Sequence, residues 1–268
     1  MSTTTLSVLA EESPLHLSLP YETSLLAMGL AGQILGQYSL NEMTPVRSSD
    51  LNKSDLAPWD RFAAGRYNKT ASSASDVLVL AVGGSMFCVD AWEKTRSQIT
   101  WTPVLQDGII LGEAMTWAAA LSLNVRAMRL HPRPFVYDST NGSTRSDREA
   151  PEAAGSFFSG HASAAFVGAA YLATVYPLRH PEFQHPGLLW AGSLTAASTV
   201  AILRVAAGKH FPSDVVAGAG VGALLGWGFA KMHESHNADS KNSWFFNAWP
   251  SLEGDGFAIQ AVKPLAAL

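Results

Sequence analysis

The sequence has little charge, a single cysteine and no basic excess. Asp, Glu, Lys and Arg make up 15% of the 268 residues, whereas an ordinary soluble domain carries roughly 25%. The net charge of −4 supplies no global positive field, so we expect no nucleic-acid partner. Cys88 alone excludes an internal disulfide and cannot by itself form a thiolate metal site.

A basic leader and long hydrophobic runs are also missing. The first 20 residues contain Glu11 and Glu12 but no Lys or Arg, so no secretory signal is visible. Apolar stretches do follow, each shorter than the ~20 residues that comfortably span a bilayer. They cover residues 25–40, 77–89, 109–125, 162–178, 188–203 and 215–230.

None of these stretches shows a sustained period of two, which predicts an all-α bundle of about six core helices. Two interpretations stay open at this point. The stretches are either core helices of a soluble protein, or short membrane helices whose Gly, Ala and Ser suit close packing in lipid.

Composition divides the chain into three parts. They are a lead-in with the first apolar helix and a polar amphipathic segment (1–75), a helical domain (76–232) and a polar C-terminal tail (233–268). Within the first part, Trp59, Phe62 and Tyr67 predict an amphipathic helix in 41–75 that packs on the body or lies at an interface. The polar loop 138–155 is expected to form a rim or lid.

Three short segments place basic or imidazole groups at the ends of apolar stretches: 126–134, 157–163 and 204–214. In the first, Pro132 and Pro134 put Arg133 on a rigid extended turn. Taken alone, this segment also fits an ordinary basic helix C-terminus, which the helix dipole favours.

The second and third segments carry the histidines. Ser159 is a suitable N-cap for a helix that begins near His161, and Gly160 allows an anion to approach the free backbone N–H groups. Asp214 follows His210 by four residues, a spacing that lets the carboxylate fix the imidazole tautomer. Each feature alone also fits a capped helix or a structural His–Asp pair.

Arg204 lies in an apolar context, where a buried guanidinium requires an anion. The helices alternate in direction, so all three segments can share one face. Convergent arginines beside a helix N-terminus form a cradle for phosphate or another oxyanion.

The segments resemble the three signature motifs of the type 2 phosphatidic acid phosphatase / vanadium haloperoxidase superfamily, over roughly residues 75–232. The matching residues are Arg133-Pro134, Ser159-Gly160-His161 and Arg204…His210…Asp214. Arg126 stands where the family has Lys, which keeps the charge but replaces a point ammonium by a planar fork. Phe158 and Leu203 replace a Pro and a Ser of the family pattern.

The resemblance implies a metal-independent phosphatase in which His210 attacks phosphorus to form a phosphohistidine. Asp214 would orient His210, and His161 would protonate the leaving group and then activate water. The implied phosphate-binding residues are Arg126, Arg133, Arg204, Ser159 and Gly160. Lys209, His131 and Tyr137 are expected at the rim. No metal or other cofactor is expected, and vanadate should inhibit.

The expected substrate is a phosphomonoester or pyrophosphate, most simply of a lipid, at a membrane such as the bacterial inner membrane. A soluble, non-specific acid phosphatase of the periplasm is one alternative. A vanadate-dependent haloperoxidase is another, although the chain is short for that activity. The intact set of His161, His210 and Asp214 argues against a third alternative, a membrane scaffold without activity.

Overall fold

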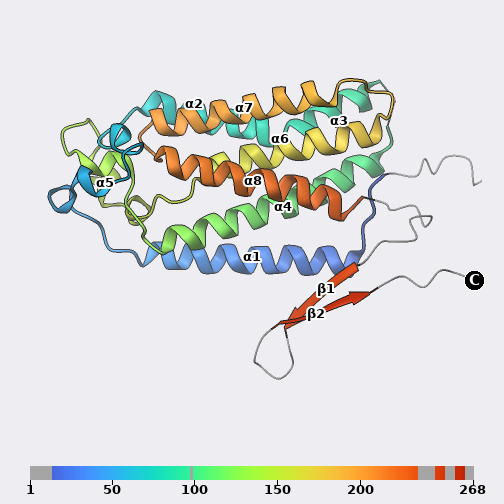
Figure 1. The fold of residues 1–268 in the computed structure, drawn as a ribbon, viewed down its shortest axis with the longest axis horizontal. Coiled ribbons are helices and arrows are strands. Elements are labelled where there is room, and N and C mark those ends of the chain that lie inside the picture. Colours follow the sequence, from blue (N-terminus) through green and yellow to red (C-terminus); the bar gives the residue numbers. More distant parts are fainter. Residues whose placement is uncertain (1–13, 97–98, 235–244, 251–256, 263–268) are drawn as a thin grey trace, which may run out of the picture. The chain divides into compact units, whose positions relative to one another are not determined.

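The computed structural model describes residues 14–96, 99–234, 245–250 and 257–262. The described residues up to His233 belong to one compact unit, which is a bundle of long helices (Figure 1). The helices are α1 (Leu19–Asn41), α2 (Lys69–Gly83), α3 (Ser85–Thr95), α4 (Trp101–Ala127), α5 (Arg145–Glu149), α6 (Gly160–Arg179), α7 (Pro186–Ala206) and α8 (Pro212–Met232).

The predicted all-α bundle is confirmed. Five of the apolar stretches each lie within one long helix, and the stretch at 77–89 runs from α2 into α3. These two helices meet at Gly84 with a bend of 52° and together form one broken rod. The bundle therefore consists of about six rods, as the sequence predicts.

Small residues set the closest packing of the bundle. Gly218, Gly222 and Gly226 recur every fourth residue along α8 and lie against the backbone of α6. A Cβ on any of them would collide with a carbonyl oxygen of that helix. The two helices therefore lie side by side with their N-termini at the same end of the bundle, which brings the second and third motifs together.

Large apolar side chains lie on the outside of this bundle. Examples are Ile34 of α1, Leu80 of α2, Leu188 of α7 and Trp227 of α8, all exposed. Three helices (α4, α7 and α8) are long and apolar enough to cross a membrane, and the α2–α3 rod qualifies if counted as one span. Small residues inside and large apolar residues outside are consistent with a lipid environment.

The amphipathic helix predicted in 41–75 is wrong. The structure has single 3₁₀ turns at Ser48–Asp50, Lys53–Asp55 and Arg61–Ala63, and α2 already begins at Lys69. Pro45, Pro58 and Gly65 interrupt the segment, and Gly65 has a φ of 88° that a helix does not allow. The predicted division at 75/76 consequently lies inside α2. Trp59 and Phe62 remain exposed.

Residues 234–268 form a separate unit. It contains an antiparallel hairpin of β1 (Phe245–Pro250) and β2 (Phe257–Val262), with Phe245 opposite Val262. The sequence analysis does not predict this hairpin. The rest of the predicted tail, apart from His233 and Glu234, lies outside the described residues.

Candidate active site

The three motifs meet at the end of the bundle that also carries α5 (Figure 1). The C-termini of α4 and α7 supply Arg126 and Arg204, and the N-termini of α6 and α8 supply His161 and Asp214. The chain crosses the bundle back and forth, and this course gathers groups that lie far apart in the sequence.

His210 lies between α7 and α8 and is 2% exposed. Its Nδ1 is 3.0 Å from the backbone oxygen of Ser156 and 3.5 Å from Asp214 Oδ2. A proton on Nδ1 is therefore donated to a carbonyl, which leaves the lone pair on Nε2. The loop reaches this position because Gly208 has a φ of 70° and lies against the backbone of Arg66, where a side chain would not fit.

Asp214 is fully buried, and its carboxylate is shared. Oδ2 accepts hydrogen bonds from the Ser156 hydroxyl and from Phe211 N, the latter at 2.8 Å. Oδ1 lies 3.3 Å from Nε2 of His131. The closer contact of His210 Nδ1 is thus with the Ser156 carbonyl, and Asp214 holds the surrounding loop as well as the imidazole.

Backbone hydrogen bonds connect the motif segments to one another. Ser159 N donates to the oxygen of Asp214 at 3.0 Å, and Phe135 N donates to the oxygen of Gly208 at 3.1 Å. Because backbone groups form these links, the relative positions of the three segments are fixed independently of their side chains.

The three arginines lie near His210 with few partners of opposite charge. Arg133 and Arg204 are both buried, and the Nε of each lacks a hydrogen-bond partner. Arg126 Nε donates to the oxygen of Gly155 at 3.3 Å. Among the described residues, no carboxylate lies within ion-pair distance of Arg133. An oxyanion would satisfy these donors, which fits the predicted cradle.

Burial and mutual repulsion shift the protonation equilibria of these groups. Burial, with the positive charges of Arg204 and Arg133, holds the pKa of His210 well below its usual value, so the imidazole is neutral at neutral pH. Burial lowers the pKa of Arg133 to about 9, aided by the charge of Arg126, and it remains a cation at neutral pH. The site thus holds a neutral imidazole beside cationic guanidinium groups.

His161 lies in the first turn of α6, and its side chain contacts Asp76. Nε2 of His161 lies 2.9 Å from Oδ1 of Asp76, and the same oxygen is 3.1 Å from an Arg204 guanidinium nitrogen. The sequence analysis does not single out Asp76, because it lies in α2, far from every motif. Its place beside the boundary of an apolar stretch is the only signal that the sequence gives.

The remaining predicted site residues fall into two groups. Ser159 is the N-cap of α6, and its hydroxyl accepts from Ala162 N at 3.3 Å, as expected for an anion-binding helix start. Gly160 is the first residue of that helix. Lys209 is at the edge, with Nζ 4.9 Å from the Phe135 ring centroid.

The other two predicted rim residues lie deeper than expected. His131 contacts Asp214 and packs edge-on against Phe211, with ring centroids 5.1 Å apart. Tyr137 also packs edge-on against Phe211, with ring centroids 5.8 Å apart, and burial raises the pKa of Tyr137 to about 12. Both side chains thus support the loop that carries His210. Sequence reasoning also misses Ser156, because a serine in a polar loop has no distinctive pattern.

An apolar cavity of about 400 Å³ starts at the site. Gly160, His161 and Ala164 of α6 form one side of it, and the rest of its wall comes from α2, α3, α4 and Gly84 between α2 and α3. Representative wall residues are Leu80, Gly84, Phe87, Gly112 and Met115. The break between α2 and α3 and the glycines facing it leave this space open. An apolar chain fits such a cavity.

Comparison with protein-family models matches residues 107–238 to the PAP2 superfamily. Comparison with curated proteins found no match, and neither did comparison with solved structures. The matched segment contains all three motifs described above, from Arg126 to Asp214. The match supports a hydrolase of the phosphatase type. Over residues 107–238 the chain is therefore similar to the PAP2 superfamily.

Proposed function

We propose that the protein is a membrane-embedded phosphatase that hydrolyses a lipid phosphate or pyrophosphate through a phosphohistidine. The observation that carries the proposal is the apolar cavity lined by His161, a residue that shares the Asp76 carboxylate with Arg204 of the cradle. One lipid phosphate could occupy both places, with its phosphate in the cradle and its acyl or isoprenoid chain in the cavity. The exposed apolar side chains around the bundle favour delivery of that substrate from a membrane.

In the first step, the Nε2 lone pair of His210 attacks phosphorus. The bond from phosphorus to the leaving oxygen breaks, and protonated His161 gives its proton to that oxygen. The Ser156 carbonyl keeps the His210 proton on Nδ1 and so keeps Nε2 nucleophilic. The guanidinium groups stabilise the charge that builds on the equatorial phosphate oxygens.

In the second step, water attacks the phosphohistidine. Neutral His161 takes a proton from the water, and phosphate leaves as His210 regains its neutral form. No divalent metal enters either step, because the arginines supply the counter-charge. Burial and the charge of Arg204 lower the pKa of His161 to about 4, and Asp76 opposes this shift and so favours the protonated form.

The test is phosphate release by the full chain in detergent, from a lipid phosphate, a lipid pyrophosphate and p-nitrophenyl phosphate. We expect turnover that survives EDTA, is inhibited by vanadate and is lost in His210→Ala. Trapping of ³²P on the wild type, stable to base and labile to acid, would identify the phosphohistidine.

The substrates also separate the alternatives. A soluble acid phosphatase would favour p-nitrophenyl phosphate and would purify without detergent. Activity that requires a divalent metal, or that persists in His210→Ala, overturns the mechanism. Oxidation of bromide by peroxide in the presence of vanadate, without phosphate release, would assign the haloperoxidase activity instead.

A further inference from the structure

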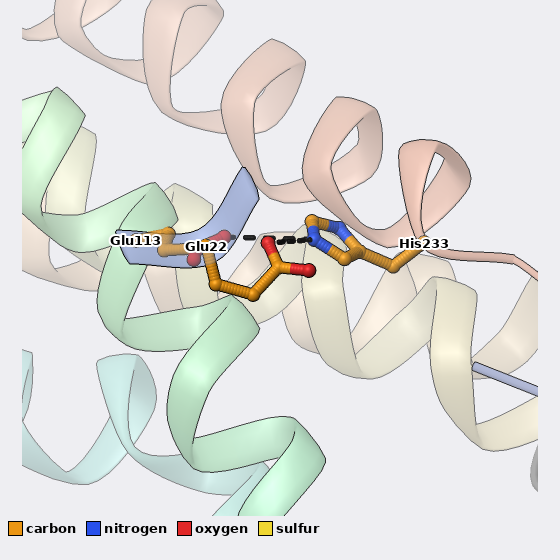
Figure 2. Close-up of side chains that lie close together, drawn as sticks. All are labelled: Glu22, Glu113 and His233. Atoms are coloured by element: carbon orange, nitrogen blue, oxygen red, sulfur yellow. Dashed lines mark hydrogen bonds and ion pairs between the residues drawn. The ribbon is translucent and has the colours of Figure 1, made fainter. Parts of the chain in front are cut away.

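A second cluster of buried ionisable side chains lies near the opposite end of the bundle from the arginine cradle. Glu22 of α1, Glu113 of α4 and His233, which follows α8, point toward one another (Figure 2). Their exposed fractions are 4%, 0% and 3%. The phosphatase mechanism uses none of them.

The hydrogen bonds of His233 fix the role of its second nitrogen. Nδ1 lies 2.7 Å from the backbone oxygen of Phe229, so it carries a proton and donates it. Nε2 therefore faces the carboxylates, at 3.0 Å from Glu22 Oε2 and 3.6 Å from Glu113 Oε2. A histidine that donates one N–H to a carbonyl and presents the other nitrogen to carboxylates has the arrangement of a metal ligand.

Glu113 supplies the second, independent observation. It is fully buried, yet neither of its carboxylate oxygens has a hydrogen-bond partner. Glu22, in contrast, accepts a hydrogen bond from Ser18 N at 2.6 Å. An ionised carboxylate without hydrogen bonds is costly to bury, so Glu113 requires a positive ligand or a proton.

We propose that Glu22, Glu113 and His233 bind one divalent transition-metal cation of the Zn²⁺ or Mn²⁺ class. One ligand atom from each residue lies within 4.8 Å of the other two. Metal–ligand bonds of about 2.0–2.2 Å need a separation of at most about 4.2 Å, so a small closure completes the site. The imidazole nitrogen favours such metals over Mg²⁺ and Ca²⁺, which prefer oxygen ligands.

The position of the cluster indicates a structural role for the cation. It connects α1 and the end of α8, the first and last helices of the bundle, through the middle of α4. α1 otherwise packs mainly on α4. A bound cation would thus hold the bundle closed at the end away from the cradle, and phosphate release would not require it in the chemical step.

The experiment uses the full chain in detergent, stripped with a chelator and then titrated separately with Zn²⁺, Mn²⁺, Mg²⁺ and Ca²⁺. We expect about one equivalent of Zn²⁺ or Mn²⁺ to bind and to raise the thermal midpoint. Glu113→Gln and His233→Ala should each weaken binding by at least tenfold and abolish the thermal shift. Glu93→Gln is the matched control, because Glu93 is also buried and pairs with a single histidine, His180.

Several outcomes would overturn the proposal. One is wild-type protein that neither binds nor is stabilised by any of the four cations, which would leave a proton shared between the carboxylates. Another is retention of the metal by Glu113→Gln. If the variants fail to fold, Co²⁺ added to the stripped wild type decides the question. Visible absorption bands of Co²⁺ bound to nitrogen and oxygen, displaced by Zn²⁺, support the site, and their absence contradicts it.

Discussion

The two ends of the helical bundle bury charge of opposite sign. At one end, Arg133 and Arg204 are buried with unpaired Nε donors around a neutral His210. Toward the other end, Glu22 and Glu113 share one histidine. In each case the chain leaves part of the charge without a partner, so each end is suited to a ligand of the opposite sign.

A third buried cluster differs from both because its cation has ion-pair partners within the chain, although Arg179 Nε, like the Nε of Arg133 and of Arg204, has no hydrogen-bond partner. Arg179 pairs with Asp90 at 2.9 Å and also with Asp107, which accepts a hydrogen bond from the Tyr171 hydroxyl. Here the guanidinium has carboxylates on two sides. The comparison teaches that buried charge alone does not mark a ligand site. Buried charge that the chain does not balance with opposite charge does.

The largest expected effect breaks the closed cluster. Arg179→Met leaves Asp90 and Asp107 buried without a counter-ion, so we expect a loss of about 3–5 kcal/mol in stability or failure to fold. Thermal unfolding in detergent measures it, with the partly conservative Arg179→Lys as control. A midpoint equal to the wild type would contradict a structural role for this cluster.

Arg133→Gln should lower activity without lowering stability, in contrast to Arg179→Met. The substitution removes a donor from the cradle, so kcat/KM should fall by about 10²–10³-fold. Because the guanidinium is buried without a carboxylate partner, the thermal midpoint should not fall. Vanadate should stabilise the wild type but not the variant.

The control for this prediction is Arg145→Gln. Arg145 is exposed and paired with Glu149, and its loss should change neither kcat/KM nor the midpoint. If Arg133→Gln unfolds like Arg179→Met, the two clusters do not differ in the way proposed.

The pH dependence sharpens the comparison further. Burial and the neighbouring arginines hold the pKa of His210 well below the unfolded value of about 6.5. The nucleophile therefore stays neutral below pH 6.5, and the acid limb of kcat/KM should lie below that value. In the same range the unfolded chain binds more protons than the folded chain, so stability also falls as the pH decreases.

Two corrections keep this measurement interpretable. The second ionisation of a phosphomonoester, near pH 6, is subtracted from the profile. Return of samples from acid to neutral pH before assay separates loss of folding from loss of the neutral imidazole. An acid limb at or above 6.5 after both corrections would mean that the arginines do not act on His210.

The sequence predicts the motif residues but not their supporting partners. The motifs have a fixed spacing, so Arg126, Arg133, Arg204, His161, His210 and Asp214 are identifiable, and alternating apolar helices predict that they meet. Asp76 and Ser156 are not predicted, because only the tertiary fold brings them to the site. Neither carries a local pattern that distinguishes it from an ordinary helix start or loop serine.

The same reason explains the errors elsewhere. Residues 41–68 contain aromatic residues at roughly helical spacing, but Pro58 and Gly65 break the chain into turns that cover the end of the bundle. The Glu22–Glu113–His233 cluster joins residues from three distant parts of the chain. Glu113 is visible in the sequence only as an acidic interruption of an apolar stretch, and nothing local indicates its partners.

The smallest expected effect concerns Asp76, whose carboxylate is the one that forms an ion pair with a cradle arginine among the residues that the structure describes. It contacts both Arg204 and His161 while its side chain is 54% exposed. Phosphate competes with this carboxylate for Arg204, so Asp76→Asn should lower KM. Loss of the negative charge also weakens the protonated form of His161, which lowers the rate of proton donation to the leaving group.

The leaving group separates these two consequences. An alkyl phosphate needs the proton, so its kcat should fall by about threefold to tenfold in Asp76→Asn, a small part of the roughly 10²–10⁴-fold that a general acid contributes. The p-nitrophenolate group leaves without a proton, so its kcat should change little while its KM falls. Equal losses of kcat on both substrates would show that Asp76 only supports the fold. A KM that rises would mean that the carboxylate orders the cradle for phosphate rather than competing with it.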